Sequence, residues 1–253
     1  MHVVESRLLA HGPFGRAERA ARELIDLDDK GVTSYIVNRD IPEGLDRTYC
    51  ELAFSLGKLA RELAGRTAPL RTIETSCYGQ LEPYAKWLLV SILAGVWEDF
   101  DRSNNHDKAL KFLQEMGIEY NNRPVDTVKG FSNSIAIDLV TEVAEGQLKR
   151  TSVRGTVAEG MLMVSRINEF DRLYFPPFGN ILVCMYQDRP GVVACIAGHL
   201  AAAQINIEDM RNPHDLKTNR SLAILSVNKP VPEAVVKALG KDISAATALF
   251  LQL

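Results

Sequence analysis

The last 75 or so residues carry an order of strands and helices that few folds accommodate. Apolar and β-branched runs with strand periodicity are separated by two short helical stretches and by polar loops. The order is strand, helix, strand, strand, helix, strand, which is the split β-α-β, ferredoxin-like plan. The predicted strands are 181–187, 205–211, 221–227 and 245–253, and the predicted helices are 191–203 and 232–239.

A domain boundary is predicted at 174–179, where paired prolines and a glycine interrupt two strand-rich stretches. Before it, a stripe of apolar residues from Tyr49 to Leu63 predicts a helix that stops at Gly65. Alternating and helical patterns then predict strands at 71–78, 132–145, 151–157 and 161–167, and helices at 81–96 and 106–116.

The expected architecture is therefore α/β (α+β). An α/β domain spans 45–173 and a ferredoxin-like βαββαβ domain spans 178–253. Residues 1–44 show one helical stretch, about 16–29, and one extended stretch, 32–37. These two elements are too few to build a core, so we interpret 1–44 as the tail of another domain.

Composition and charge restrict the function classes. A hydrophobic fraction of 46% with 24% charged residues is typical of a globular protein with a real core. The 29 basic and 32 acidic residues give a net charge of −3, which argues against nucleic-acid binding. The longest apolar run, from Trp87 to Trp97, is about half of a membrane span, and no signal peptide opens the chain. We expect a cytoplasmic protein that binds no membrane.

No known catalytic motif is present, and we expect neither a catalytic residue nor a metal site. The four cysteines are widely spaced, without a Cys-x-x-Cys pair, and are interpreted as small buried hydrophobes. The five histidines are scattered. We expect His199 to be a surface or interface residue rather than a catalytic one.

The most informative segment runs from Tyr186 to Val192, where a strand ends and a helix begins. Pro190 suits a first helical turn, and Gly191 allows close approach to the backbone. Free N–H groups at a helix start attract a carboxylate, and Asp188 could hold an ammonium beside it. Such a pair describes a free amino acid. The alternative, equally open, is that Asp188 only caps the helix.

Asn206, at the start of the next predicted strand, slightly favours the ligand interpretation, because a polar amide between two isoleucines can face a ligand at that loop. It can equally satisfy a turn carbonyl.

The segment 180–192, continuing into Gln204–Ile207, resembles the opening of an ACT domain, a regulatory small-molecule module, and most closely the one that ends D-3-phosphoglycerate dehydrogenases. The region from about Leu45 to Phe170 resembles the allosteric-substrate-binding domain of the longer forms of that enzyme. The resemblance implies feedback control by L-serine bound where two ACT domains meet, in a homodimer or homotetramer. The implied serine contacts are Tyr186, Asp188, Arg189, Pro190, Gly191, Val192 and Asn206.

The middle domain of this family can also hold an anionic effector or substrate. Four local cations are the suspected ligands, although a solvated basic face is a competing interpretation. They are Lys149, Arg150, Arg154 and Arg166.

The resemblance does not extend to the nucleotide-binding half of the family. NAD would belong to that half, so we expect no cofactor in this chain and no dehydrogenase activity from it alone. The chain is then a piece of such an enzyme or a free-standing relative of its regulatory half. Two further hypotheses are a regulatory subunit that docks with a separate dehydrogenase or serine dehydratase, and a module that serves assembly only.

Overall fold

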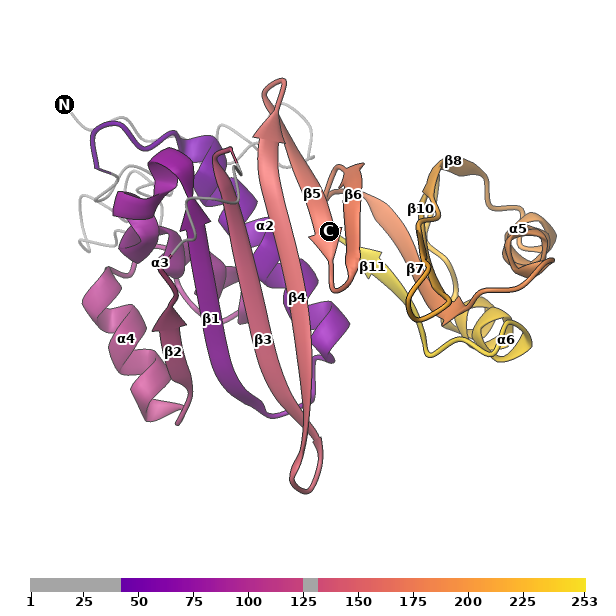
Figure 1. The fold of residues 1–253 in the computed structure, drawn as a ribbon, viewed down its shortest axis with the longest axis horizontal. Helices are drawn as coiled ribbons and strands as arrows, with labels where there is room; N and C mark the ends of the chain where they lie inside the picture. Colours follow the sequence, from indigo (N-terminus) through magenta and orange to yellow (C-terminus); the bar gives the residue numbers. More distant parts are fainter. Residues whose placement is uncertain (1–41, 125–131) are drawn as a thin grey trace, which may run out of the picture.

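A computed structural model of the chain describes residues 42–124 and 132–253. The helix and strand predicted within 1–41 lie outside the described residues. The described part is a mixed α/β structure built around two β-sheets (Figure 1). In the described ranges, no helix is long and apolar enough to cross a membrane.

The first sheet has six strands in the order β2-β1-β3-β4-β5-β6. Strands β1 and β2 are parallel, and every other neighbouring pair is antiparallel. The strands are β1 (Leu70–Tyr78), β2 (Glu119–Asn122), β3 (Ser134–Ala144), β4 (Gln147–Ala158), β5 (Met161–Ile167) and β6 (Phe170–Phe175).

Three α-helices accompany this sheet: α2 (Arg47–Ala64), α3 (Ala85–Val96) and α4 (His106–Glu115). Helix α2 begins where the Asp46 side chain accepts a 2.8 Å hydrogen bond from the Thr48 N–H, and it ends at Gly65, as predicted. Helices α2 and α3 cross very closely. A Cβ on Gly95 would lie 2.1 Å from the Phe54 carbonyl oxygen, so the crossing requires glycine there.

Three features of this domain differ from the sequence prediction. The expected helix 81–96 is divided into a 3-10 helix (Gly79–Tyr84), which contains Pro83, and α3. Strand β2 was not predicted, because its four polar residues lack strand periodicity. Strand β6 was also missed, and it runs into the segment that the prolines marked as a boundary.

The second sheet has the order β11-β7-β10-β8, with the two-residue β9 paired to β10. All of its pairings are antiparallel, and β7 and β8 run parallel with β10 between them. This confirms the predicted ferredoxin-like βαββαβ plan. Its elements are β7 (Asn180–Gln187), α5 (Val192–Ala202), β8 (Ile207–Arg211), β9 (His214–Asp215), β10 (Arg220–Val227), α6 (Glu233–Asp242) and β11 (Thr247–Gln252).

Strand β7 is buried on both faces, and its two faces belong to different cores. Leu182, Cys184 and Tyr186 pack in a core with α5 and α6, which lie on the side away from the first sheet (Figure 1). Ile181 and Val183 belong to the core that continues into the first domain. The strand that leads to the β7–α5 turn is therefore held rigidly from both sides.

Candidate functional site

The β7–α5 turn presents the start of a helix without a side-chain cap. Gly191 is the N-cap residue, and its φ of 90° lies in the left-handed region that favours glycine. Helix α5 begins at Val192, one residue later than predicted, so Pro190 precedes the helix rather than lying in its first turn. The uncapped helix start leaves amide N–H groups suited to an anionic group.

Asp188 does not cap this helix, which decides against one of the two interpretations of that residue. Its backbone N–H donates to the Asn219 carbonyl at 2.9 Å. Its carboxylate accepts a 2.7 Å hydrogen bond from the Ser221 hydroxyl on β10 and lies 3.6 Å from the His214 Nδ1. The side chain remains 41% exposed, so the carboxylate is both oriented and accessible.

Tyr186 is almost completely buried on β7, under the helices of the second domain. Its hydroxyl donates a 2.7 Å hydrogen bond to the Asn212 side chain. Burial raises the pKa of the phenol, so the group stays protonated at neutral pH. Tyr186 therefore stabilises the β7–α5 turn from the protein interior, as part of the buried core beside it.

Arg189 and Asn206 are exposed residues at opposite ends of the second sheet. Strands β7 and β8 run parallel, and Arg189 follows the end of β7 whereas Asn206 precedes the start of β8. The Arg189 guanidinium donates to the Asp242 carbonyl at 3.4 Å, which ties the turn to the end of α6. Asn206 precedes β8, and its backbone N–H and C=O both pair with Asn228. No turn carbonyl accepts from the Asn206 side chain among the hydrogen bonds of the described residues.

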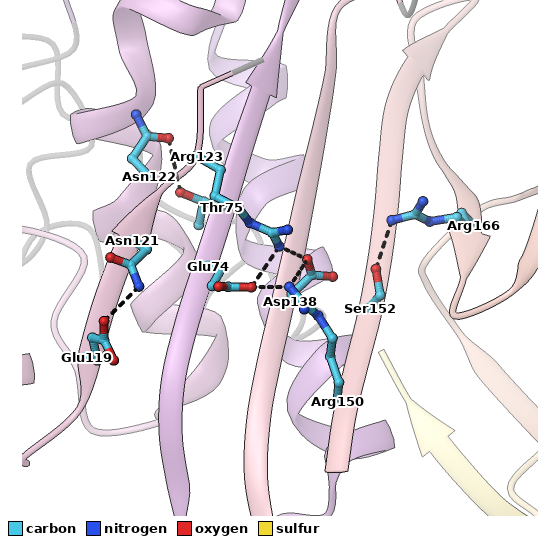
Figure 2. Close-up of polar contacts among 10 residues, drawn as sticks. All are labelled: Glu74, Thr75, Glu119, Asn121, Asn122, Arg123, Asp138, Arg150, Ser152 and Arg166. Atoms are coloured by element: carbon cyan, nitrogen blue, oxygen red, sulfur yellow. Dashed lines mark hydrogen bonds and ion pairs between the residues drawn. The ribbon is translucent and has the colours of Figure 1, made fainter. Parts of the chain in front are cut away.

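A second polar cluster lies on the first sheet, on the face away from α2 (Figure 2). The Arg150 guanidinium contacts Glu74 and lies 3.1 Å from an Asp138 oxygen. Arg123, just after β2, contacts the same two carboxylates, at 2.9 Å for Glu74. Two guanidinium groups and two carboxylates thus neutralise one another, so this end of the face is not a free basic surface.

Arg154 and Arg166 lie directly opposite each other on β4 and β5. Arg154 donates to Asp171 at 2.8 Å and to the Ser165 hydroxyl at 3.3 Å. Arg166 donates to the Ser152 hydroxyl at 2.8 Å, while its buried Nε has no hydrogen-bond partner among the described residues (Figure 2). Burial and then the charge of Arg166 lower the pKa of Arg154. The two guanidinium groups repel each other. A negatively charged ligand between them, in addition to Asp171, would offset this repulsion.

The structure brings Arg150, Arg154 and Arg166 onto one face and does not place Lys149 with them. Successive strand residues alternate between faces, and the Lys149 ammonium donates to the Leu63 carbonyl at the end of α2. Glu74, Asp138 and Arg123 were missed at the sequence level. An acidic residue within the apolar run 135–139 was the available signal for Asp138.

Two cavities among the described residues lie apart from both the β7–α5 turn and the polar face of the first sheet. One of about 590 Å³ is formed by α2 and the segment that follows α3, with Lys58, Arg61 and Arg66 in its lining. Another of about 490 Å³ lies between Tyr49, the turn at Gly79 and Thr156. Neither of these two cavities is lined by residues of the β7–α5 turn.

The sequence of the chain is similar to that of a curated enzyme. Over 206 residues the chain is 25% identical to D-3-phosphoglycerate dehydrogenase of Synechocystis sp. (strain ATCC 27184 / PCC 6803 / Kazusa). The chain is a distant relative of that enzyme. The match covers 80% of this chain and 36% of the relative, so the chain spans only about a third of the relative's length. No family model matches the chain.

Proposed function

We propose that this chain is the regulatory, amino-acid-binding portion of a D-3-phosphoglycerate dehydrogenase-like protein of serine biosynthesis. Its ferredoxin-like domain acts as an ACT domain, pairs with a second copy in a homodimer or homotetramer, and binds L-serine or a similar amino acid between the two. The observation that carries the proposal is the juxtaposition at the β7–α5 turn of an uncapped helix start and the oriented carboxylate of Asp188.

The two ends of an amino acid match the two parts of this turn. The ligand carboxylate accepts hydrogen bonds from the N–H groups at the start of α5, where the helix dipole also favours negative charge. The ligand ammonium pairs with Asp188, whose carboxylate the Ser221 hydroxyl holds in one orientation. Arg189, exposed beside the turn, supplies a further polar group to the ligand. Asn206 is exposed at the opposite end of the sheet and would reach the ligand only from the second copy.

A second subunit is required because the turn on one chain is open to solvent. A partner copy placed over it would exclude water and strengthen the ion pair at Asp188. Ligand binding across two chains then favours one mutual arrangement of the subunits, with a coupling free energy of about 1–3 kcal/mol. Feedback control by the end product follows from such coupling. The resemblance implies that the catalytic chemistry under this control, with NAD as cofactor, lies in a part of the family's enzymes that this chain does not match.

Two other functions would use the same fold. A regulatory subunit would dock with a separate dehydrogenase or serine dehydratase, and a purely structural module would assemble through its sheet edge. The first predicts co-purification with a nucleotide-binding subunit, and the second predicts oligomers that bind no amino acid. Both retain a folded ferredoxin-like domain, so only ligand and partner measurements separate them from the leading proposal.

Calorimetric titration of the reduced protein with each of the twenty amino acids tests the proposal. L-serine, or a similar small amino acid, is expected to release or absorb heat with the wild-type protein and to do neither with Asp188→Asn. Asp209→Asn is the matched control, because among the described residues the side chain of that half-exposed aspartate on β8 pairs only with Arg211. A folded, dimeric protein that binds none of the twenty contradicts the proposal, as does serine binding that survives Asp188→Ala combined with Asn206→Ala.

A further inference from the structure

Helices α5 and α6 bring together three side chains of types that commonly bind metal ions. Cys195 and His199 are four residues apart on α5 and therefore lie on the same helix face. Asp242 is the last residue of α6. The Cys195 Sγ, a ring nitrogen of His199 and a carboxylate oxygen of Asp242 all lie within 4.8 Å of one another. The sequence alone does not show that these three residues lie together, because Asp242 follows His199 by 43 residues.

We propose that Cys195, His199 and Asp242 form a three-ligand site for Zn²⁺ on the outer surface of the second domain. Thiolate, imidazole and carboxylate are the three ligand types that zinc takes in proteins, and three protein ligands leave the fourth tetrahedral position to water. One thiolate and one carboxylate also neutralise the charge of the ion.

Small side-chain movements bring the three ligand atoms to coordination distance. Around zinc, bond lengths of about 2.0–2.3 Å place neighbouring ligand atoms about 3.3–3.7 Å apart. The His199 Nε2 lies 2.8 Å from the Asp242 Oδ2, so these two must separate slightly. The sulfur must approach from within 4.8 Å. All three residues are partly exposed or exposed, which leaves room for rotation and access for the ion.

This site lies outside the proposed amino-acid site and does not depend on it. Arg189 contacts the backbone carbonyl of Asp242, not its carboxylate, so its hydrogen bond leaves the ligand oxygens available. A bound ion would link α5 to α6, two helices that meet through apolar packing and through the His199–Asp242 contact. Zinc would thereby stabilise the folded second domain by mass action.

The test is a titration of the reduced, untagged protein with Zn²⁺, followed by calorimetry, and with Co²⁺, followed by absorption. We expect one ion per chain and a thiolate-to-cobalt charge-transfer band. Cys195→Ser should abolish the band, and Cys195→Ser and His199→Gln should each weaken binding by at least about 100-fold, since loss of an outer-shell partner alone costs about 10–100-fold. Cys50→Ser and His106→Gln, which change a cysteine and a histidine elsewhere in the described chain, should leave both signals unchanged.

Two results would overturn the inference. One is a folded wild-type protein, verified by circular dichroism, that takes up neither ion over the whole titration. The other is Zn²⁺ binding of undiminished affinity in the Cys195→Ser, His199→Gln double variant, which would assign the ion to other residues.

Discussion

The Ser221 hydroxyl on β10 donates a 2.7 Å hydrogen bond to the carboxylate of Asp188, which follows β7. The pairing of β10 with β7 places Ser221 opposite Tyr186, two residues before Asp188. A buried serine thus fixes the direction of an exposed carboxylate. This orientation lets the β7–α5 turn present a defined negative group to a ligand.

Replacing Ser221 by alanine should weaken the proposed amino-acid site without removing its charge. The Asp188 carboxylate loses its fixed orientation, and we expect the affinity for L-serine to fall about tenfold, since hydrogen bonds to charged groups are worth about 1.5–3 kcal/mol. Calorimetry measures the affinity. The control is Ser226→Ala on the same strand, and equal effects of the two variants would contradict the role given to Ser221.

Replacing Gly95 by alanine should destabilise the first domain. The added methyl group would lie 2.1 Å from the Phe54 carbonyl oxygen, so α2 and α3 must move apart, at a cost of about 1–3 kcal/mol. Urea unfolding monitored by circular dichroism measures the change. Gly198→Ala, on helix α5 with open space around it, should instead be neutral or stabilise by up to about 1 kcal/mol. Similar stabilities for the two variants would contradict the close crossing.

The buried thiols of Cys77 and Cys184 should not react in the native protein. Burial raises the pKa of each to about 12, so almost no thiolate forms at pH 8. A thiol-specific reagent should modify these two cysteines only after unfolding in guanidinium chloride, with the sites identified by mass spectrometry. Rapid labelling of either one in the folded protein would contradict its burial.

The same two pKa values predict how stability depends on alkaline pH. A thiol with a raised folded-state pKa remains protonated in the native protein while the unfolded chain ionises from about pH 9. The contribution to the free energy of unfolding is therefore complete below pH 9 and falls as the pH rises toward 12. Cys184→Ala should reduce this slope between pH 9 and pH 11 in urea unfolding experiments. An unchanged slope would contradict the assignment to Cys184.

An anion should bind between Arg154 and Arg166 rather than at Arg150. The first two face each other across β4 and β5, whereas Arg150 is already paired with Glu74 and Asp138. Titration with inorganic phosphate should show binding that Arg166→Gln weakens about tenfold, in keeping with one charged hydrogen bond of about 1.5 kcal/mol. Arg150→Gln is the control. If both variants bind phosphate as the wild type does, the face is a solvated surface and not an anion site.

Local patterns predicted most of the regular elements, because helices and half-buried strands have distinct periods. The stripe from Tyr49 to Leu63 became α2, and the alternation in 132–145 became β3. Strand β2 could not be found this way, since Glu119–Asn122 is a polar segment that forms a strand only by pairing with β1. Propensity alone does not show such pairing.

The contacts of the site residues depend on which strands pair and in which register, and a single sequence does not show this. The turn around Asp188 was found from local chemistry, but its partner Ser221 follows 33 positions later and meets it only through the pairing of β10 with β7. Alternation along β4 already separates Lys149 from Arg150, so the four suspected cations could have been divided from the sequence. The pairing of Arg154 with Arg166, across a bulge, could not.

NMR spectra of the backbone amides of the ¹⁵N-labelled protein, recorded during a titration with L-serine, test the amino-acid site most directly. The proposed site predicts that the largest shifts belong to the amides of Asp188, Arg189, residues 191–194 and Asn206, and that Asp188→Asn abolishes them at the same serine concentration. Spectra that do not change with serine would contradict it. So would shifts that cluster on the face of the first sheet around Arg154 and leave the β7–α5 turn unaffected.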